Sequence, residues 1–227
     1  MDISLIETLR WEPEGGFVRL EQHLARLARS GAALGLAGSK AAEQALFAAL
    51  PPSALPNCSF MGEFPGRAEG AAPQLSPLRI RLEFFPDGRI DVQAVPFTPL
   101  AASTVWRLKI AATRLASTDP LLRHKTSRRA PYVAARAEFS TAEADEVVLA
   151  NERGDICEGT ITSLFLDDGT GILKTPPLAS GLLAGVLREE LLETGKAIEQ
   201  ILRPEDLAQG TVFVGNSLRG LIRGHLA

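Results

Sequence analysis

The chain has 227 residues, of which 24 are Lys or Arg and 27 are Asp or Glu, so its formal net charge is −3. Hydrophobic residues make up 45% and charged residues 22%, as in folded globular proteins and unlike disordered chains. The slight acidic excess argues against a nucleic-acid-binding domain, and no apolar run approaches the ~18 residues that a membrane-spanning helix needs. Because the first residues also lack a secretory signal, we expect a cytoplasmic protein with no nucleic-acid or membrane partner.

The residues that bind metals or form disulfides are scarce. Only Cys58 and Cys157 are present, and the three histidines, His23, His124 and His225, are scattered along the chain. Neither set has the spacing of a zinc site or of a disulfide framework. We therefore expect no bound metal.

The first half of the chain alternates strand and helix signals. A β-branched and aromatic run is typical of a strand, and leucines at helical spacing from Leu20 to Leu34 predict an amphipathic helix. Asp87-Gly88 between two alternating runs predicts a hairpin. The expected elements are a strand at 3–11, helices at 20–34 and 40–50, a Pro/Gly-rich loop at 51–77, hairpin strands at 78–85 and 89–97, and a strand at 104–111.

The second half has shorter predicted elements. Pro131 near the start of a helical pattern predicts a helix at 131–138, because proline loses least at a helix start. The other expected elements are a strand at 146–150, a meander of strands at 157–166 and 172–175, a helix at 183–193 and a buried strand at 211–214. Together the elements predict an α+β fold with a small N-terminal subdomain at 1–115 and a larger C-terminal subdomain at 116–227.

A cluster of five basic side chains lies within seven residues, from Arg123 to Arg129. One interpretation is a solvated basic surface. The other centres on Lys125: a lysine crowded by arginines and withdrawn from water has a lowered pKa, so its neutral amine can form a Schiff base near pH 7. The neighbouring arginines could then hold an anion. The spacing alone does not choose between the two.

Four other positions have both an ordinary structural interpretation and a functional one. Glu158, between Cys157 and Gly159, is either an edge-strand carboxylate facing water or a buried one that needs a cationic partner. Arg26 is by default a solvated residue on the polar face of the first helix. Backbone N–H groups where Val186 and Leu187 open a helix, and at 215–217 after a strand, could receive a phosphate.

Taken together, these segments resemble the class IV aminotransferase family, the pyridoxal-phosphate enzymes of fold type IV. The matching blocks are LIETLRW with HLARLARSGAALGL, HKTSRR, DEVVLANERGDICEGTITSLF, and TPPLASGLLAGVLREELL with VFVGNSLRG. They cover most of the chain apart from about residues 40–77. The block from Asp145 to Phe165 is the most specific, because its turn, its Glu-Gly pair and its final Phe have family spacing.

The resemblance implies a role for each residue. Lys125 would carry pyridoxal phosphate, and Glu158 would keep the pyridine nitrogen protonated so that the ring can accept electrons. Arg26 would pair with the phosphate. The phosphate cup would be completed by Val186, Leu187, Asn216 and Ser217. Three positions depart from the family pattern. The chain starts almost at the LIET segment, which weakens inference about the substrate. Ser163 stands where an Asn is common, which would alter hydrogen bonding around the cofactor, and Leu187 lacks the hydroxyl common there, so its phosphate contact would be through the backbone alone.

The resemblance leaves the reaction open. We favour a lyase that converts 4-amino-4-deoxychorismate to 4-aminobenzoate and pyruvate, a step of folate biosynthesis. The alternatives are an aminotransferase acting on branched-chain or D-amino acids, and a catalytically silent cofactor-binding protein. Arg81 (or Arg79) and Arg128 could bind a substrate carboxylate, although an exposed strand arginine is the bland interpretation. The family also implies a homodimer, with a loop that could cover the partner's pocket.

Overall fold

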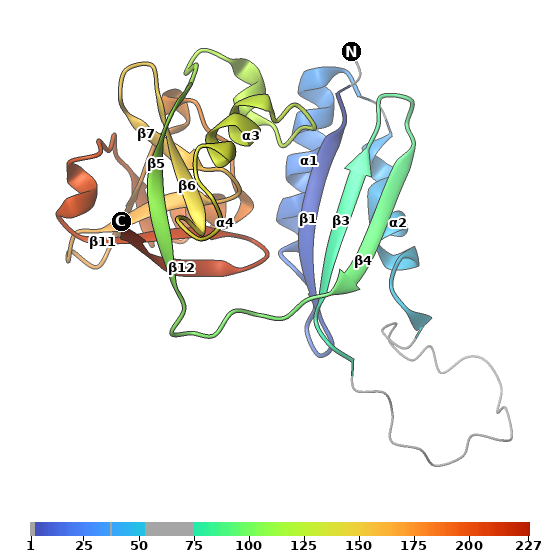
Figure 1. The fold of residues 1–227 in the computed structure, drawn as a ribbon. Helices are drawn as coiled ribbons and strands as arrows, with labels where there is room; N and C mark the ends of the chain where they lie inside the picture. The colour runs from blue at the N-terminus through green and yellow to red at the C-terminus, as the bar shows by residue number, and fades with distance from the viewer. Residues whose placement is uncertain (1–2, 37, 53–74) are drawn as a thin grey trace, which may run out of the picture.

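The computed structural model describes residues 3–36, 38–52 and 75–227. Most of the loop expected at 51–77, including Cys58, lies outside these residues. The described chain forms two subdomains side by side, one built on a four-stranded sheet and one on an eight-stranded sheet (Figure 1). Helices and sheets are mixed in both, which confirms the predicted α+β class and the fold of the type IV enzymes.

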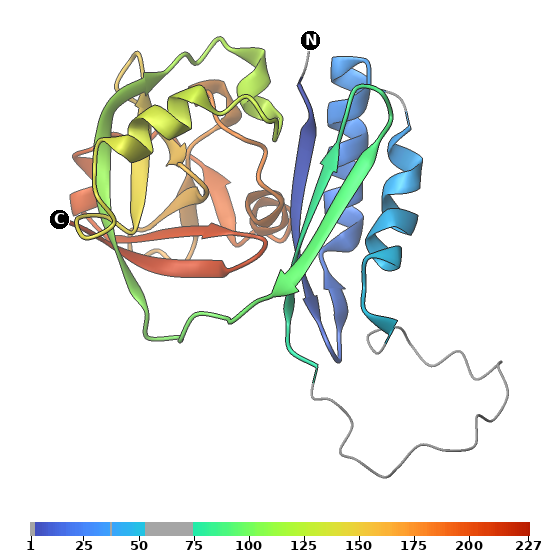
Figure 2. The same ribbon diagram turned by 45° about the vertical axis from the view of Figure 1, so that its right-hand side comes forward.

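The N-terminal subdomain packs two helices on one face of an antiparallel sheet (Figure 2). Strand order is β2-β1-β3-β4. Leu5, Leu9 and Trp11 alternate along β1 and pack with Leu27 of α1 and Leu46 of α2, because every second strand residue faces the same side. The elements are β1 (Leu5–Glu12), β2 (Gly16–Val18), α1 (Leu20–Leu34), η1 (Ser39–Ala41), α2 (Ala42–Ala48), β3 (Leu78–Phe84) and β4 (Ile90–Pro96).

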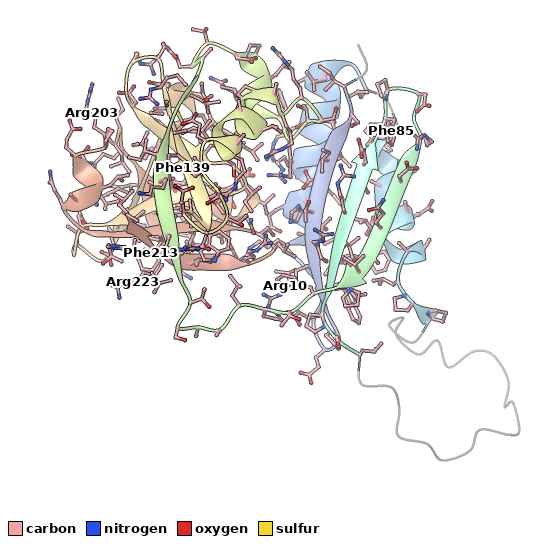
Figure 3. The ribbon with its side chains drawn as sticks, viewed as in Figure 1. Arg10, Phe85, Phe139, Arg203, Phe213 and Arg223 are labelled. Atoms are coloured by element: carbon pink, nitrogen blue, oxygen red, sulfur yellow. The ribbon has the colours of Figure 1, made fainter. Side chains whose placement is uncertain are left out.

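The β3–β4 hairpin forms at the predicted Asp-Gly turn. Gly88 has φ of +87°, a left-handed conformation that a side chain disfavours. Next to it, the Arg89 guanidinium lies 3.6 Å from the centroid of the Phe85 ring, at the end of β3 where Figure 3 labels that phenylalanine. The cation–ring contact helps to hold the turn.

The C-terminal subdomain is built on a sheet that closes on itself. Its order is β10-β9-β8-β11-β12-β5-β6-β7, and β7 also pairs with β8, so six strands form a ring. A core including Leu108, Val148, Leu164 and Val214 fills it. The elements are β5 (Val105–Leu115), η3 (Pro120–Arg123), α3 (Ala130–Ala137), β6 (Glu146–Asn151), β7 (Ile156–Gly159), β8 (Ser163–Asp167), β9 (Leu173–Thr175), η4 (Leu178–Ser180), α4 (Val186–Glu193), β10 (Ala197–Glu199), η5 (Asp206–Ala208), β11 (Thr211–Asn216) and β12 (Gly220–Leu226).

The predicted subdomain boundary after residue 115 does not match the sheet pairing. Strand β5 was assigned to the N-terminal half, but it pairs in parallel with β12 and with β6 in the second sheet. Both partners come later in the sequence, so local patterning could not reveal them. The change of subdomain therefore lies between the end of β4 and the start of β5.

The run 157–166, predicted as one strand, is two strands joined by a tight turn. The buried carboxylate of Glu146 accepts hydrogen bonds from the backbone N–H of Thr160 (3.0 Å) and of Ile161 (3.1 Å), and from the hydroxyl of Thr162 (2.8 Å). These donors gather around one carboxylate and close the turn, while the Thr160 N–H also reaches the Val147 carbonyl of β6 at 3.0 Å. Glu158 consequently lies at the end of β7, directly before this turn.

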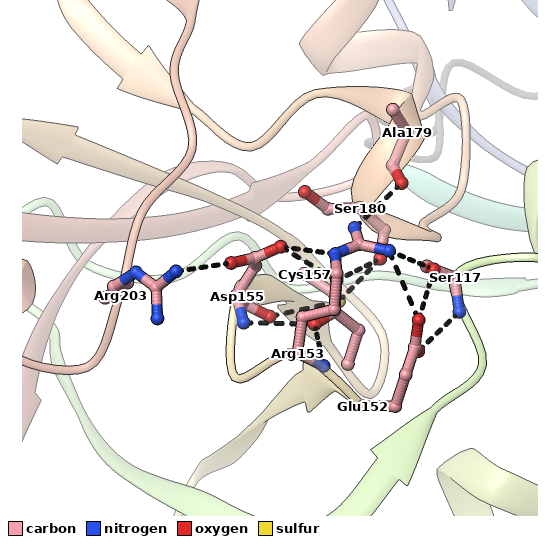
Figure 4. Close-up of polar contacts among 9 residues, drawn as sticks. Ser117, Glu152, Arg153, Asp155, Cys157, Ala179, Ser180 and Arg203 are labelled. Carbon is pink, nitrogen blue, oxygen red and sulfur yellow. Dashed lines mark hydrogen bonds and ion pairs between the residues drawn. The ribbon is translucent and has the colours of Figure 1, made fainter.

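Polar contacts brace the β6–β7 turn against the segment that leads to α4. Arg153 donates to the Asp155 carboxylate (3.0 Å) and to the carbonyl of Ala179 (3.2 Å), as Figure 4 shows. The buried Asn151 amide donates to the carbonyl of Ser180 at 3.0 Å. The network fixes residues 179–180 just before Leu183, whose backbone N–H enters the site.

Two further boundaries differ from prediction. The helix expected at 183–193 begins at Val186, with Gly185 as its extended N-cap. Gly215 and Asn216, expected to follow the last strand, are part of β11, and Ser217 begins the turn to β12. Strands β2, β10 and β12 were not predicted, because each is short or rich in polar residues and glycine.

Candidate active site

A cavity of about 250 Å³ lies where the two subdomains meet. Thr8 and Arg26 line it from the N-terminal subdomain, and Lys125, Glu158 and Ser217 line it from the C-terminal one. The junction is held by main-chain hydrogen bonds from Ile6 N–H to the Lys125 carbonyl (2.8 Å) and from Ser127 N–H to the Ser4 carbonyl (3.0 Å). The start of β1 and the residue before it thereby fix the backbone from Lys125 to Ser127.

Lys125 brings an amine into this cavity. Its side chain is partly buried, and burial, Arg26 and Arg129 together lower its pKa from 10.5 to about 8. An amine with such a pKa is neutral in a substantial fraction of molecules near pH 7.5, which is what a nucleophile or proton acceptor requires. The basic cluster is therefore not a uniformly solvated surface, although Arg123 and Arg128 are exposed.

Glu158 is the buried carboxylate opposite this amine. Burial raises its pKa to about 7, although Tyr132, the Leu183 N–H and Lys125 act in the opposite direction. The Tyr132 hydroxyl donates to Oε1 at 2.7 Å, and the Leu183 N–H donates to the same oxygen at 3.1 Å. Among the described residues no donor reaches Oε2. That oxygen can accept a hydrogen bond from a cationic N–H group in the cavity.

Tyr132 also lines the cavity, although the sequence gave it no role, and so does Arg129, which the sequence identified only as a member of the basic cluster. Burial and Glu158 raise the pKa of the Tyr132 phenol, so it stays protonated and remains a donor. The Arg129 guanidinium lies 4.7 Å from the Tyr132 ring centroid and donates to the Thr160 carbonyl. Both residues are on or beside α3, whose weak amphipathic pattern gave no signal of a site.

Arg26 is buried rather than solvated, and it is paired. Its guanidinium donates to Glu7 Oε1 (2.9 Å) and Oε2 (2.6 Å), and to the Ala184 carbonyl (3.2 Å). Burial alone would raise the pKa of Glu7, but Arg26 and His23 lower it to about 2. The sequence contains one indication that this acid is buried: Glu7 lies between Leu5 and Leu9 on the inward-facing side of β1.

His23 extends this ion pair toward the second subdomain. Its Nδ1 lies 2.6 Å from Glu7 Oε2, and its Nε2 lies 2.7 Å from the hydroxyl oxygen of Ser217. The ring is almost wholly buried, and burial, opposed by Glu7, lowers its pKa below 6.5. Sequence reasoning gave His23 no role beyond its place in the HLAR motif.

The predicted phosphate cup is brought together at one end of the cavity. Val186 and Leu187 are the first two residues of α4, where backbone N–H groups have no partner within the helix. Ser217 presents its hydroxyl beside them. The Asn216 amide is already used, since it donates to the Ile161 carbonyl (3.1 Å) and accepts from the Arg219 N–H (3.0 Å). Asn216 thus holds the turn in place.

Gly185 makes this arrangement possible. A Cβ at Gly185 would lie 2.6 Å from the hydroxyl oxygen of Ser163, so no larger residue fits between α4 and β8. Ser163, which replaces the more common Asn, is buried against the helix start and lines the cavity.

The three arginines considered for a substrate carboxylate are placed differently. Arg79 lines the cavity, whereas Arg81, on the same strand, does not and donates to Glu83 at 2.6 Å. Arg128 lines the cavity, and its guanidinium lies 3.6 Å from the Asp119 carboxylate. A fourth arginine, Arg219, also lines it, and burial and Arg79 lower its pKa.

Two other structural findings bear on the expected partners. Within residues 3–36, 38–52 and 75–227, no cluster of His, Cys, Asp and Glu side chains could hold a metal ion. In the same part of the chain, no helix combines the length and the apolar composition needed to cross a membrane.

Comparison with known proteins places this site in a family. The family described as "Amino-transferase class IV" matches residues 4–226. A Mesorhizobium loti crystal structure named as an amino-acid aminotransferase is 45% identical, with a TM-score of 0.84 over 100% of both chains. A Schizosaccharomyces pombe protein named as an aminodeoxychorismate lyase is 31% identical over 69% of this chain and 70% of its own.

A third relative, named as a branched-chain-amino-acid aminotransferase of Thermotoga maritima, is 33% identical over 57% of this chain and 47% of its own length. Relatives with both activities in their names thus match the same sequence. Because the family match spans nearly the whole chain, this protein is an enzyme of the class IV aminotransferase family.

Proposed function

We propose that this enzyme uses pyridoxal 5′-phosphate and that Lys125 is the residue that binds it covalently. The observation that carries the proposal is the pairing of a partly buried amine and a buried carboxylate in one cavity. Lys125 has its pKa lowered to about 8, and Glu158 has its pKa raised to about 7. An amine able to lose its proton and a carboxylate able to meet a cation fit an aldehyde cofactor with a basic ring nitrogen.

The rest of the cavity fits the other parts of the cofactor. Glu158 Oε2 would accept a hydrogen bond from the ring nitrogen, while Tyr132 and the Leu183 N–H hold Oε1. Arg26, the N–H groups that open α4 and the Ser217 hydroxyl would hold the phosphate, because a helix start favours anions. When bound, the cofactor supplies an electron sink that stabilises negative charge on the amine-bearing carbon of a substrate.

The chain's own residues then move the proton. With a substrate amine in its place, the Nζ of Lys125 would be free to accept a proton from the amine-bearing carbon. Arg26 and Arg129 keep Nζ from holding protons too tightly, because their charges lower its pKa. The same amine can return the proton at a second carbon or to a leaving group. The substrate determines which of these two groups receives the proton.

We favour 4-amino-4-deoxychorismate as that substrate, because the cavity has more cationic groups than the cofactor requires. Arg79 and Arg219 line it beyond the phosphate cup, and Arg128 lies on the same wall. A substrate with two carboxylates suits this excess charge. The reaction releases pyruvate and 4-aminobenzoate, which together contain all the atoms of the substrate, so no co-substrate is needed.

An aminotransferase is the second candidate. Apolar residues, Leu121, Leu183 and Leu218, also line the cavity and could receive the side chain of a branched-chain or D-amino acid. The relatives from Mesorhizobium loti and Thermotoga maritima bear aminotransferase names. In this reaction Lys125 Nζ would return its proton on the cofactor side, water would supply the oxygen of the released keto acid, and the amino group would pass to a second keto acid.

A substrate panel tests the two candidates. The purified enzyme, supplied with pyridoxal phosphate, is incubated with 4-amino-4-deoxychorismate, and pyruvate and 4-aminobenzoate are measured. Parallel incubations use leucine or D-alanine with a keto-acid acceptor. Release of both products from the first substrate supports the lyase. Keto-acid exchange without pyruvate release moves the assignment to aminotransferase, and Lys125→Ala should abolish either activity.

A homodimer and a cytoplasmic location also remain proposals. Support for a dimer comes from a second cavity, edged by Val133 (64% exposed) and Ile161 (45% exposed). Ile161 lines the active-site cavity too, so a partner covering it would also cover the site. Light scattering of the wild type and of Val133→Asp tests this, with a mass of one chain in both contradicting it.

A further inference from the structure

Helix α1 holds Ser217 from two sides. His23 Nε2 lies 2.7 Å from the Ser217 hydroxyl oxygen, and Arg19 Nη1 donates to the Ser217 carbonyl at 3.3 Å. Arg19 is the only non-glycine residue with positive φ (58°) in the described part of the chain. Ser217 is therefore fixed by the N-terminal subdomain, although its own strand belongs to the other one.

The hydrogen-bond chain behind Ser217 has a defined direction. Glu7 is a carboxylate, because Arg26 holds its pKa near 2, and a carboxylate can only accept hydrogen bonds. His23 Nδ1 must therefore carry the proton that it donates to Glu7 Oε2. The charge of the ring then depends only on Nε2, the nitrogen that faces Ser217.

The charges around His23 come from every element packed against it. Glu7 of β1 favours the protonated ring, whereas burial, Arg26 on the same helix and Lys125 favour the neutral ring, and together they lower its pKa. Beyond Ser217, the Arg19 charge is paired with Glu190 of α4 at 2.6 Å. In the free protein near pH 8 the ring is thus neutral.

A neutral His23 fixes the Ser217 hydroxyl in the wrong direction for a phosphate. Nε2 without a proton accepts, so Ser217 donates its only proton to His23 and offers the cavity lone pairs alone. A phosphate ester carries two negative charges near pH 8 and can only accept. If the hydroxyl simply rotated toward the phosphate, Nε2 would be left buried without a donor.

We propose that His23 is a positioning residue that takes up a proton when a phosphate group binds beside Ser217. The protonated Nε2 donates to the Ser217 oxygen, which frees the hydroxyl proton for the phosphate. The protonated ring then donates a hydrogen bond to both Glu7 and Ser217. The negative charge of the phosphate favours this protonated form. This inference rests on the proposed cofactor site but not on the choice between lyase and aminotransferase.

Calorimetry of the whole protein tests the proton uptake. The probe is pyridoxamine 5′-phosphate, which has the phosphate but no aldehyde to react with Lys125. Titration near pH 8 in two buffers of different protonation enthalpy gives the number of protons bound. The control is His23→Gln, because a glutamine amide can present either a donor or an acceptor to Ser217 without a proton.

We expect the wild type to take up as much as one proton more than His23→Gln. Protons that move at Lys125 or Glu158 are common to both proteins and cancel in the difference. Wild-type affinity should also fall by up to about tenfold more per pH unit than that of the variant, over the pH range between the free-state and the bound-state pKa of His23. Equal proton uptake in the two proteins overturns the proposal.

Imidazole NMR of the wild type keeps the test independent of how His23→Gln folds. With ligand bound near pH 7.5, the His23 ring should show the shifts of an imidazolium, assigned by comparison with His124→Gln and His225→Gln. Ser217→Ala should show a smaller change. A His23 ring that stays neutral with ligand bound, or full proton uptake in Ser217→Ala, refutes the coupling. Absence of any binding refutes instead the proposed cofactor site, and the inference with it.

Discussion

Tyr132 donates its hydroxyl hydrogen to Oε1 of Glu158 at 2.7 Å, which leaves Oε2 of that carboxylate for a ligand. The contact joins α3 to β7 and stabilises the charged form of a carboxylate that burial would otherwise neutralise. It therefore links the packing of a helix to the protonation state of the site.

Removing that hydroxyl should shift a pH profile. Tyr132→Phe deletes a hydrogen bond that lowers the pKa of Glu158, so this pKa should rise above about 7. Because a cationic ring nitrogen needs the ionised carboxylate, the acid limb of kcat/KM should move to higher pH. At pH 7 the loss should be about tenfold, the equivalent of about 1.4 kcal/mol. An unchanged acid limb would show that Tyr132 does not act through Glu158.

Neutralising the carboxylate itself should separate binding from turnover. Glu158→Gln keeps the size of the side chain but removes the charge that faces the ring nitrogen. We expect retained cofactor absorbance and a loss of at least about 100-fold in kcat. The measurement is the visible spectrum with steady-state kinetics, and normal activity in this variant would remove Glu158 from the mechanism.

Lys125 should make the cofactor-free protein less stable below pH 8. Its pKa is lowered from 10.5 to about 8 in the folded state, so between these values the unfolded chain binds more protons and stability rises with pH. Lys125→Met should thus exceed the wild type in unfolding free energy by about 2 kcal/mol at pH 7, and the difference should shrink toward pH 10. Urea unfolding at both pH values measures it. A constant difference would contradict the lowered pKa.

Arg79 and Arg81 form a matched pair for testing substrate recognition. They lie two residues apart on β3, but only Arg79 lines the cavity, and Arg81 is bound to Glu83. Arg79→Ala should lower kcat/KM for a carboxylate substrate by about 10–100-fold, the worth of one charge-assisted hydrogen bond. Arg81→Ala should change it by less than about threefold. The reverse order would restore Arg81 as the substrate residue.

Removing one charge of the buried Glu7–Arg26 ion pair, which lies behind the phosphate cup, should lower the free energy of unfolding. Glu7→Gln leaves the Arg26 charge buried without an anionic partner, with only neutral carbonyl acceptors on Ala184 and on the new glutamine. We expect a loss of about 3–5 kcal/mol in unfolding free energy. The double variant Glu7→Gln/Arg26→Met should recover part of this loss, since it removes the unpaired charge. Because the pKa of Glu7 is about 2, the wild-type contribution is complete above pH 4.5 and declines as pH falls toward 2.

Gly159 should tolerate no side chain. A Cβ there would lie 2.3 Å from the Thr162 hydroxyl oxygen and 2.7 Å from Glu146 Oε2, inside the turn that Glu146 organises. Gly159→Ala should lower the unfolding free energy by about 1–3 kcal/mol and weaken cofactor binding, because Glu158 is the preceding residue. Thermal unfolding and cofactor titration measure both effects. Gly15→Ala controls for the cost of losing a glycine elsewhere, because Gly15 has no positive φ and a Cβ there would meet only the Glu12 Cβ at 4.0 Å.

Local patterns in the sequence were sufficient for several of the elements and for the family. Three patterns depend only on residues close together in the chain, so the sequence alone reveals them. They are the alternation in β1, the leucine spacing of α1 and the Asp-Gly hairpin. The motif containing Lys125 and Glu158 was also readable, because its residues keep family spacing along the chain. Arg26, Val186, Leu187 and Ser217 followed from the same resemblance, and the structure brings them to one cavity.

Long-range contacts decided the rest. The pairing of β5 with β12, the turn around Glu146 and the choice of Arg79 over Arg81 depend on residues distant in sequence, whose approach no local pattern records. The near-zero net charge likewise concealed a buried Glu7–Arg26 pair and a lysine with a lowered pKa. Charge and composition are sums over the chain, whereas protonation depends on which groups burial brings together. Only the tertiary structure fixes that.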